Sequence, residues 1–444
     1  MITLTSKRNP NLSIRYTQPE LCDPNVIQYS GYFDIQKEDV HYFFWFFESK
    51  AENAPLTLWL NGGPGCSSMG GLFTGPGPCK VTDNGIDIKA VYNPYSWHRY
   101  SNILFLDQPA GTGFSYGTGT INRTEDGATY VYESLQLFFE IFPQYIKLPF
   151  HMFGESYAGR YVSEYARYIL EKNSMIKNNN ESSSASIAVE QIILLESVAF
   201  GNPHIDPFYH YQSSPQMACN STNPFTAPPE TCKRMSEIFE EECAPLLKQC
   251  SATNSVEDCH KARNICVQIE RLFDATGQSS TDVRIPSVQD TPPQTYARFL
   301  NLPSTRKHIG ANALYTECKA SVRIPFLETG DNARKTSPSI TFLLNQGIRV
   351  LVFVGDVDYL CNWYGNNALF NALPWYHADH YRAQSLKPWM LNSREVGQIK
   401  SWGPLTFIRV YQAGHDVPYY QPLPSLAMFQ AWIKNITLNP LQSM

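Results

Sequence analysis

One serine stands among small residues in the segment Gly154-Glu155-Ser156-Tyr157-Ala158-Gly159. It follows the apolar run Phe150 to Phe153 and opens a segment with helical periodicity. A serine on a sharp strand-to-helix turn projects its hydroxyl out of the sheet, and the tight turn needs small neighbours. The usual pattern has glycine two residues after the serine, and here Ala158 takes that place, with Gly159 next. Ser156 is a candidate nucleophile. The alternative is an ordinary strand–turn–helix with an incidental serine.

A nucleophilic serine needs a base, and the base needs an acid that fixes its tautomer. Where a serine sits on such a turn, the acid and then the histidine follow it in the chain, on loops after late strands. Gly355-Asp356-Val357-Asp358 follows one late apolar run, and Gln412-Ala413-Gly414-His415-Asp416 follows another. We predict that His415 is the base. The residues alone leave open whether Asp356 or Asp358 is the acid.

A glycine-rich loop, Asn61-Gly62-Gly63-Pro64-Gly65-Cys66, ends an early apolar run. Converging backbone N–H groups are needed to stabilise an oxyanion, and a loop of this kind can supply one. A phosphate-binding loop is the alternative. No Lys-Ser/Thr pair follows and the Walker spacing is absent, which argues against that alternative.

Short apolar runs bounded by Gly, Pro or Asn recur along the chain, with amphipathic segments between them. This pattern is typical of a buried, largely parallel sheet, and it predicts a doubly wound α/β fold. The clearest predicted helix starts at Ala158 and places Tyr161, Val162, Tyr165, Ala166 and Ile169 on one face. The predicted strands are Phe43–Phe47, Leu56–Leu60, Asn102–Leu106, Phe150–Phe153, Ile192–Leu195, Arg349–Val354 and Thr406–Tyr411.

The alternation breaks between His204 and Thr336, a stretch rich in cysteine, proline and charged helical pieces such as Cys232 to Leu247. We therefore predict a core of residues 1–203 and 337–444, with residues 204–336 as a disulfide-stapled cap insertion. Lys172 to Ala188 contains consecutive asparagines and a serine run, and it is predicted to be a surface loop.

Charged residues make up only 17% of the 444 residues and the net charge is -5. This small and evenly spread charge argues against a nucleic-acid partner. No apolar run approaches the ~20 residues that a membrane span needs. We expect no cofactor and no bound metal.

Six of the eleven cysteines lie between Cys219 and Cys266. The alternative to disulfides is a metal site, but the cluster lacks a CxxC pair. Disulfides imply an oxidising compartment, either secreted or vacuolar-lysosomal. Possible N-glycosylation sites, which support this compartment only weakly, occur at Asn11, Asn122, Asn180, Asn220 and Asn435.

With these motifs in order, the chain resembles the serine carboxypeptidases, a family with the α/β-hydrolase fold. The resemblance rests on segments that span nearly the whole chain: Trp59 to Ser68, Asp107-Gln108-Pro109-Ala110-Gly111-Thr112-Gly113-Phe114-Ser115, Gly154 to Gly159, Gly355 to Asp358 with Cys361-Asn362, and Ala413-Gly414-His415 with Val417-Pro418.

The resemblance implies release of single residues from peptide or protein C-termini through an acyl-enzyme. It makes Ser156 the nucleophile, Asp358 the orienting acid and His415 the base. The N–H groups of Gly63 and Tyr157 would form the oxyanion hole. Asn61 and Glu155 would bind the terminal carboxylate of the substrate. Because two carboxylates repel, one of them must carry a proton to donate a hydrogen bond. A raised pKa of Glu155 and operation at acidic pH would therefore be expected.

The resemblance also implies disulfides. A nested pair in the insertion would be Cys243–Cys266 around Cys250–Cys259, beside Cys219–Cys232 and Cys66–Cys318. Cys22–Cys79 is the pair that remains. Cys361 would stay a free thiol near the substrate pocket.

Two residues depart from the family pattern. Gly75 stands where the family usually has a second glutamate, which weakens the expected carboxylate clamp. Asp416 follows His415 where several relatives have an apolar residue, and a carboxylate there favours a basic C-terminal residue. An acyltransferase or esterase on the same scaffold remains the alternative function. A non-catalytic binding protein is disfavoured because no triad member is missing.

Overall fold

The computed structural model describes residues 1–85, 87–180, 190–222, 225–289, 292–436 and 438. The chain forms two compact units, each assembled from separate segments. The first unit comprises Met1–Gly154, Tyr161–Val198 and Gln294–Arg323, and the second comprises Glu155–Arg160, Ala199–Pro293 and Ile324–Met444. These boundaries differ from the ranges predicted for the core and the cap, and that division remains a prediction.

The first unit contains a mixed sheet in which antiparallel strands precede parallel ones. Its strands lie in the order β1 (Ile2–Thr5), β2 (Leu12–Thr17), β3 (Gln28–Ile35), β4 (Val40–Phe47), β8 (Asn102–Leu106), β5 (Leu56–Leu60) and β10 (Phe150–Glu155). The pairs from β1 to β8 are antiparallel, whereas β8, β5 and β10 are parallel. A short strand, β9 (Tyr116–Gly117), pairs with β4, and β6 (Cys79–Asp83) forms a separate hairpin with β7 (Ile88–Tyr92).

The predicted strands of this unit occur where the apolar runs placed them. β5 and β8 have the predicted bounds, and β4 and β10 contain the predicted ranges. Each residue of β5 and β8 is buried, as expected for parallel strands covered on both faces. β1 is exposed throughout, and its sequence Ile2-Thr3-Leu4-Thr5 lacks the continuous apolar run on which the strand predictions rest.

Helices of the first unit cover its sheet. They are α1 (Met69–Thr74), α2 (Gly127–Ile141), most of α3 (Ala158–Asn180), α8 (Thr295–Asn301) and α9 (Pro303–Ile309). α2 packs on β2 and β3. The face of α3 predicted from its spacing is buried. Short 3-10 turns are η1 (Gln36–Glu38), η2 (Trp97–Arg99), η3 (Thr124–Asp126) and η4 (Pro143–Tyr145).

The predicted surface loop from Lys172 is wrong as far as Asn180, because α3 continues to that residue. Asn173 exchanges hydrogen bonds with the backbone of Ile193 at 2.8 and 3.0 Å, and Ile176 is buried. These contacts favour helix over the loop tendency of a polar sequence. The remainder of that prediction, residues 181–189, lies outside the described residues.

The second unit contains the strand order β12 (Arg349–Gly355), β15 (Leu405–Val410), β14 (Arg394–Trp402) and β13 (Lys387–Leu391). β12 and β15 are parallel, and the other two pairs are antiparallel. The strand β11 (Leu195–Gly201) ends in this unit. Its predicted range, Ile192–Leu195, was placed too early, because the apolar residues that form the strand are Val198, Ala199 and Phe200.

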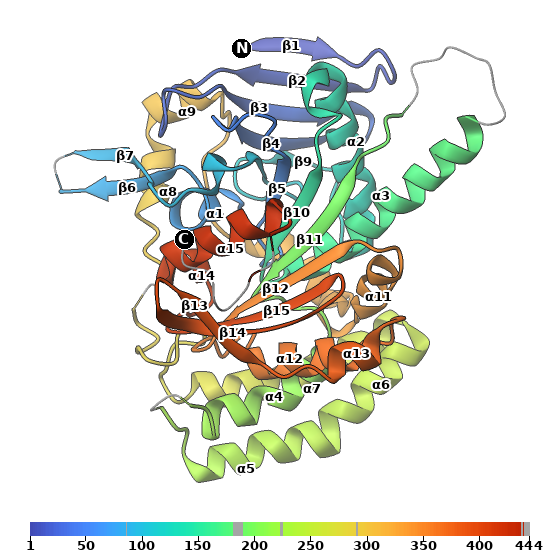
Figure 1. The fold of residues 1–444 in the computed structure, drawn as a ribbon, viewed down its shortest axis with the longest axis vertical. Helices are drawn as coiled ribbons and strands as arrows, with labels where there is room; N and C mark the ends of the chain where they lie inside the picture. The colour runs from blue at the N-terminus through green and yellow to red at the C-terminus, as the bar shows by residue number, and fades with distance from the viewer. Residues whose placement is uncertain (86, 181–189, 223–224, 290–291, 437, 439–444) are drawn as a thin grey trace. The chain divides into compact units, whose positions relative to one another are not determined.

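The helices of the second unit pack on one another and on β12 (Figure 1). α4 (Pro207–Cys219), α5 (Pro229–Glu237), α6 (Ala244–Thr253) and α7 (Val256–Asp274) pack on one another, with a π-helical stretch (Ile238–Cys243) joining α5 to α6. α11 (Ser337–Asn345), α12 (Trp363–Ala372) and α14 (Val417–Tyr420) pack on β12, and α12 also contacts α4. The others are α10 (Ala320–Glu328), which begins in the first unit, the 3-10 turn η6 (Asp331–Ala333), α13 (Ala378–Arg382) and α15 (Pro422–Ile433).

The architecture is α/β, with parallel strands and antiparallel strands in both units. The parallel strands carry the loops that hold the predicted triad. Within the described part of the chain, no helix combines the length and apolar character needed to cross a bilayer.

Candidate active site

Ser156 lies at the sharp turn between β10 and α3, in the left-handed backbone region with φ 64°. A residue with a Cβ in that region costs roughly 1–2 kcal/mol, so contacts around it must hold it there. The Ser156 N–H donates to the carbonyl of Gly201 at 2.9 Å, and its own carbonyl accepts from the N–H of His204 at 2.9 Å. The end of β11 and the loop that follows thus hold both backbone groups of the turn.

The close approach that this turn requires occurs at Gly159. A Cβ on Gly159 would lie 2.6 Å from Cβ of Pro203, which is too close for any side chain. Ala158 is fully buried and is accommodated without such a conflict. In this turn the position that has room only for glycine is Gly159, one residue after Ala158.

His415 and Asp358 lie within hydrogen-bonding distance of each other. His415 Nδ1 lies 2.9 Å from Oδ2 of Asp358, whose side chain is fully buried. The two residues follow β15 and β12, which are parallel neighbours with Gly355 opposite Val410. Because parallel strands end at the same edge of the sheet, their loops carry the histidine and the acid to one place.

Asp358 accepts further hydrogen bonds that fix its orientation. Nδ2 of Asn202 donates to Oδ2 at 2.6 Å, and the N–H groups of Leu360 and Cys361 donate to Oδ1 and Oδ2 at 3.0 and 3.2 Å. Asn202 is a residue that the sequence analysis missed. The only sequence signal was a polar side chain directly after a buried strand.

Asp356, the other candidate acid, faces elsewhere. It accepts from the N–H of Gln412 at 2.8 Å and lies 3.6 Å from Nη2 of Arg409. Burial raises its pKa, and the charge of Arg409 opposes that rise. The geometry therefore pairs His415 with Asp358, the acid that the family resemblance implied.

The imidazole of His415 has a raised pKa. Burial lowers it, but the charge of Asp358, the hydrogen bond to that carboxylate and the charge of Asp416 together outweigh burial. A second histidine, His210, lies near enough to feel both Asp358 and His415, and burial lowers its pKa to about 4. The imidazole of His210 is therefore uncharged near neutral pH.

Tyr157, the residue after the nucleophile, is held by its side chain. Its hydroxyl donates to Oδ2 of Asp331, which is buried. The Tyr157 ring stacks on His204 with centroids 6.0 Å apart and meets Phe326 edge-on at 6.2 Å. Asp331 is a second residue that the sequence analysis missed, because nothing in a Gly-Asp-Asn turn marks a distant partner.

Glu155 and Asp416 are both nearly buried acids of the second unit, with exposed fractions of 5% and 6%. Glu155 is the last residue of β10. Asp416 precedes α14, and its charge acts on His415.

Asn61 and Gly63 belong to the first unit. Oδ1 of Asn61 accepts from Nε1 of Trp59 at 2.7 Å and from the N–H of Gly71 at 3.1 Å, which fixes the amide and makes its NH2 group the donating end. Gly63 has φ 107°, and a Cβ there would lie 2.7 Å from Sγ of Cys66, so only glycine fits.

The loop that contains these residues is anchored by Asp107, from the second motif of the resemblance. Its buried carboxylate accepts from the Ser67 hydroxyl at 2.6 Å and from the N–H groups of Ser68 and Phe114 at 2.9 and 3.0 Å. Burial raises the pKa of Asp107 to about 6, although these hydrogen bonds oppose the rise.

Known proteins are similar to this chain over most of its length. The family described as serine carboxypeptidase matches residues 19–435. Carboxypeptidase S1 of Penicillium janthinellum is 37% identical over 415 residues, which cover 93% of this chain and 96% of that protein. Carboxypeptidase Y of Saccharomyces cerevisiae is 36% identical, covering 93% of this chain and 76% of that protein.

The chain belongs to the serine carboxypeptidase family. It is accordingly a serine-type carboxypeptidase with the α/β-hydrolase fold. The crystal structure of the Saccharomyces cerevisiae prohormone-processing carboxypeptidase Kex1 agrees with this fold, with a TM-score of 0.76, 26% identity and 94% of each chain covered.

The disulfides of this serine carboxypeptidase are the pairs that the family resemblance implied. In the first unit Cys22 joins Cys79 and Cys66 joins Cys318. In the second unit Cys219 joins Cys232, and Cys243–Cys266 encloses Cys250–Cys259. The pairs of the second unit lie in or beside one buried cluster formed by α4 to α7. A disulfide-rich chain fits a vacuolar or secreted compartment.

Cys361 is the free thiol, and it is buried. Burial and the charges of Asp358, Glu270 and Glu155 raise its pKa well above the usual value, so it is a poor nucleophile. Cys361, Asp358 and His415 place potential metal-ligand atoms within 4.8 Å of one another. The Asp358 oxygens already accept four hydrogen bonds, which suits a triad better than a metal site.

Four of the predicted glycosylation sites, Asn11, Asn122, Asn220 and Asn435, are exposed. The fifth, Asn180, ends α3, and its sequence triplet runs into residues 181–189, outside the described residues.

Proposed function

We propose that this serine carboxypeptidase releases single amino acids from peptide C-termini through an acyl-enzyme on Ser156. The observation that carries the proposal is the hydrogen bond between His415 Nδ1 and the buried Asp358 carboxylate. A bond at Nδ1 assigns the basic lone pair of the neutral imidazole to Nε2, the atom that a triad histidine turns toward its serine.

In the first half-reaction, Ser156 Oγ attacks the carbonyl of the last peptide bond while Nε2 of His415 takes the hydroxyl proton. The N–H of Tyr157 stabilises the oxyanion, and Gly63 is proposed as its second donor. The C–N bond then breaks and His415 gives its proton to the leaving amine. Water then attacks the carbonyl of the acyl-enzyme while His415 takes one of its protons. The ester bond breaks, His415 returns the proton to Ser156 Oγ, and the shortened peptide leaves with its new carboxylate.

We further propose that Glu155, in its protonated form, donates a hydrogen bond to the terminal carboxylate of the substrate, together with the NH2 group of Asn61. Support for Glu155 comes from its near burial beside the nucleophile. A protonated Glu155 requires acidic pH, whereas His415 must be neutral and has a raised pKa. The two requirements oppose each other, so a narrow bell-shaped profile on the acidic side is expected for free-carboxylate substrates.

A preference for basic C-terminal residues is the finer part of the proposal. Asp416 supports it. Its carboxylate is nearly buried, it directly follows His415 in the chain, and its charge acts on that histidine. A cationic side chain of the leaving amino acid would be attracted to this charge at low local dielectric.

The test is release of free amino acids from N-blocked dipeptides between pH 3.5 and 8, with Ser156→Ala as control. Release from free-carboxylate substrates at acidic pH, lost in Ser156→Ala and absent with amidated substrates, supports the proposal. Substrates ending in Lys or Arg should be cleaved better than those ending in Leu, and Asp416→Asn should remove the difference. Equal cleavage of both classes by the unmodified enzyme would contradict the basic preference.

An acyltransferase or esterase is the second candidate, and Gly75 is the observation that favours it. Gly75 caps α1 where the family usually has the second clamp glutamate. Cleavage of esters without cleavage of free-carboxylate peptides would place this candidate first.

We also propose a vacuolar or secreted location with N-glycans on the exposed asparagines, which a mobility shift after glycosidase treatment would test.

A further inference from the structure

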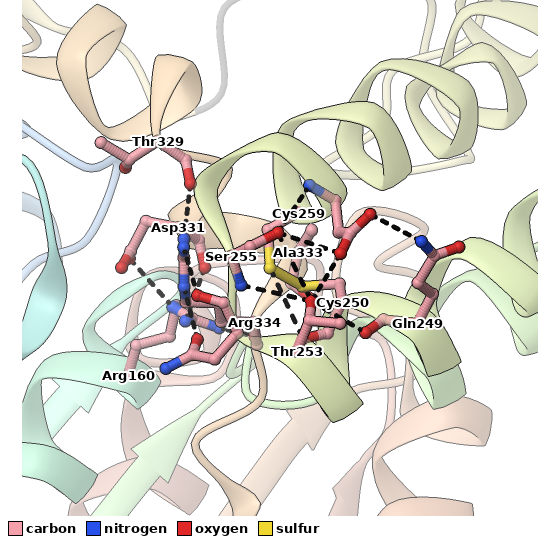
Figure 2. Close-up of a disulfide and its surroundings, with 12 residues drawn as sticks. Arg160, Gln249, Cys250, Thr253, Ser255, Cys259, Thr329, Asp331, Ala333 and Arg334 are labelled. Carbon is pink, nitrogen blue, oxygen red and sulfur yellow. Dashed lines mark hydrogen bonds and ion pairs between the residues drawn. A yellow bond between two sulfur atoms is a disulfide. The ribbon is translucent and has the colours of Figure 1, made fainter.

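The side chain of Tyr157 is part of a buried network that extends away from the catalytic groups. Figure 2 shows the part of this network formed by Arg160, Asp331 and Arg334. The Tyr157 hydroxyl bonds to Asp331 in the turn Gly330–Arg334. Arg160, in the first turn of α3, lies over the Tyr157 ring at 5.4 Å and donates to the carbonyls of Asp331 and Arg334 at 2.7 and 2.5 Å. The turn therefore binds the start of the nucleophile helix at several points.

The opposite side of the same turn rests on the small loop closed by Cys250 and Cys259. Arg334 donates through Nε to Oδ1 of Asn254 at 2.8 Å and through Nη2 to its carbonyl at 3.3 Å. Sγ of Cys250 lies 3.6 Å from the carbonyl of Ala333. Figure 2 shows the turn between Arg160 on one side and the disulfide on the other.

Gly330 makes the closest approach between the turn and the loop. A Cβ there would lie 2.3 Å from the carbonyl carbon of Cys259 and 2.4 Å from the N of His260. Its φ of 65° also favours glycine. The backbone of the turn is thus seated directly on the backbone that follows the disulfide, with no flexible side chain between them.

We propose that the Cys250–Cys259 loop positions Tyr157 through the turn Gly330–Arg334, so that Asp331 is a positioning residue and the disulfide controls kcat. The inference rests on the proposed function, in which the N–H of Tyr157 stabilises the oxyanion. The ring and the N–H of Tyr157 belong to one residue, so holding the ring limits rotation of the N–H. Ser156 needs this support because its left-handed backbone is strained.

An oxyanion donor acts in the transition state, so losing its alignment lowers kcat and leaves KM nearly unchanged. The first variants are Tyr157→Phe, which removes only the hydroxyl, and Asp331→Ala. Asp331→Asn is the conservative partner, because it keeps an acceptor for the Tyr157 hydroxyl. We expect kcat to fall about tenfold or more in Asp331→Ala and severalfold in Tyr157→Phe, with partial rescue in Asp331→Asn.

The disulfide is tested with the double variant Cys250→Ser/Cys259→Ser. Its matched control is Cys219→Ser/Cys232→Ser, which opens another bridge in the same unit, between the end of α4 and α5. We expect kcat to fall about three- to tenfold in the first variant and to stay within about twofold in the control. Combining the first variant with Asp331→Ala should give less than the product of the separate losses, because both act through one contact path.

Activity is divided by the concentration of active sites, measured as the fraction of Ser156 that a fluorophosphonate labels to completion. Misfolded protein, which does not react, is thereby excluded from kcat. Unchanged kcat in Asp331→Ala and Tyr157→Phe, a loss confined to KM, or fully multiplicative losses would overturn the inference. Ser156→Ala separates the two levels of the argument. If it is inactive while Asp331→Ala is unimpaired, only the positioning role fails; if it stays active, the proposed function fails and the inference fails with it.

Discussion

Nδ2 of Asn202 donates a 2.6 Å hydrogen bond to the same Asp358 oxygen that binds His415. Oδ1 of Asn202 accepts from the N–H of Gly355 at 3.2 Å, so the amide links the end of β12 to the acid. Several hydrogen-bond donors hold a carboxylate in one orientation. Asn202 thus supports the base indirectly, through Asp358.

Replacing Asn202 by Ala should lower kcat/KM about tenfold, since a hydrogen bond to a charged group contributes about 1.5 kcal/mol. Steady-state kinetics on a blocked dipeptide measures the effect. Asn173→Ala is the control, because Asn173 is also a buried asparagine with two backbone hydrogen bonds, but lies in the first unit. Equal losses in both variants would show a general effect of destabilisation.

Asp358→Asn should reduce kcat about 10⁴-fold, because the amide favours the wrong imidazole tautomer and does not stabilise the imidazolium. Asp356→Asn should cost less than about tenfold, since Asp356 contacts Arg409 and the Gln412 N–H but not His415. The pair is compared by kcat at one pH, with the thermal midpoint as a folding control. A larger loss in Asp356→Asn would refute the assignment of the acid.

Asp416→Asn should shift the acidic limb of the kcat/KM profile to lower pH. The negative charge of Asp416 stabilises the imidazolium and raises the pKa of His415, and only the neutral imidazole acts as base. Removing the charge lowers that pKa, so neutral His415 persists in more acidic solution; we expect a shift of about half a pH unit. An ester substrate without a free carboxylate isolates this limb from the ionisation of Glu155. A shift toward higher pH would contradict the assignment.

Cys361 should make the enzyme sensitive to mercurials but resistant to alkylation at neutral pH. The raised pKa leaves little thiolate, and alkylating agents require the thiolate. Residual activity after each reagent is the measurement, and Cys361→Ser is the control that should resist both. Full activity after a mercurial has saturated the protein thiols would refute the prediction.

Much of the fold could be predicted because the buried strands are short and continuously apolar. The apolar runs Phe43–Phe47 and Leu56–Leu60 predicted β4 and β5 in this way, and both runs are buried. The strand β1 was missed because its sequence Ile2-Thr3-Leu4-Thr5 has no continuous apolar run; it is exposed and pairs with β2. The continuation of α3 past Lys172 depended on a partner, Ile193, that local polarity does not reveal.

The candidate site divides in the same way. Ser156 and His415 stand in local motifs whose chemistry is recognisable from the residues themselves, whereas the residues alone left Asp356 and Asp358 as alternatives for the acid. The supporting residues do not, because Asn202 and Asp331 act on groups 156 and 174 positions away. Separations of this size carry no periodicity, so only the folded chain brings such pairs together.

The bridge between Cys66 and Cys318 spans 252 positions. A protease that cut one peptide bond anywhere between these cysteines would yield two polypeptides that remain covalently joined. A cut between Cys250 and Cys259 would leave its ends tied by the bridges Cys250–Cys259 and Cys243–Cys266 as well. Non-reducing electrophoresis would therefore not reveal such a cut, whether it occurred during maturation or in a protease-rich compartment. The two chains would separate only after reduction, and until then they would keep the disulfide pairs of the single chain.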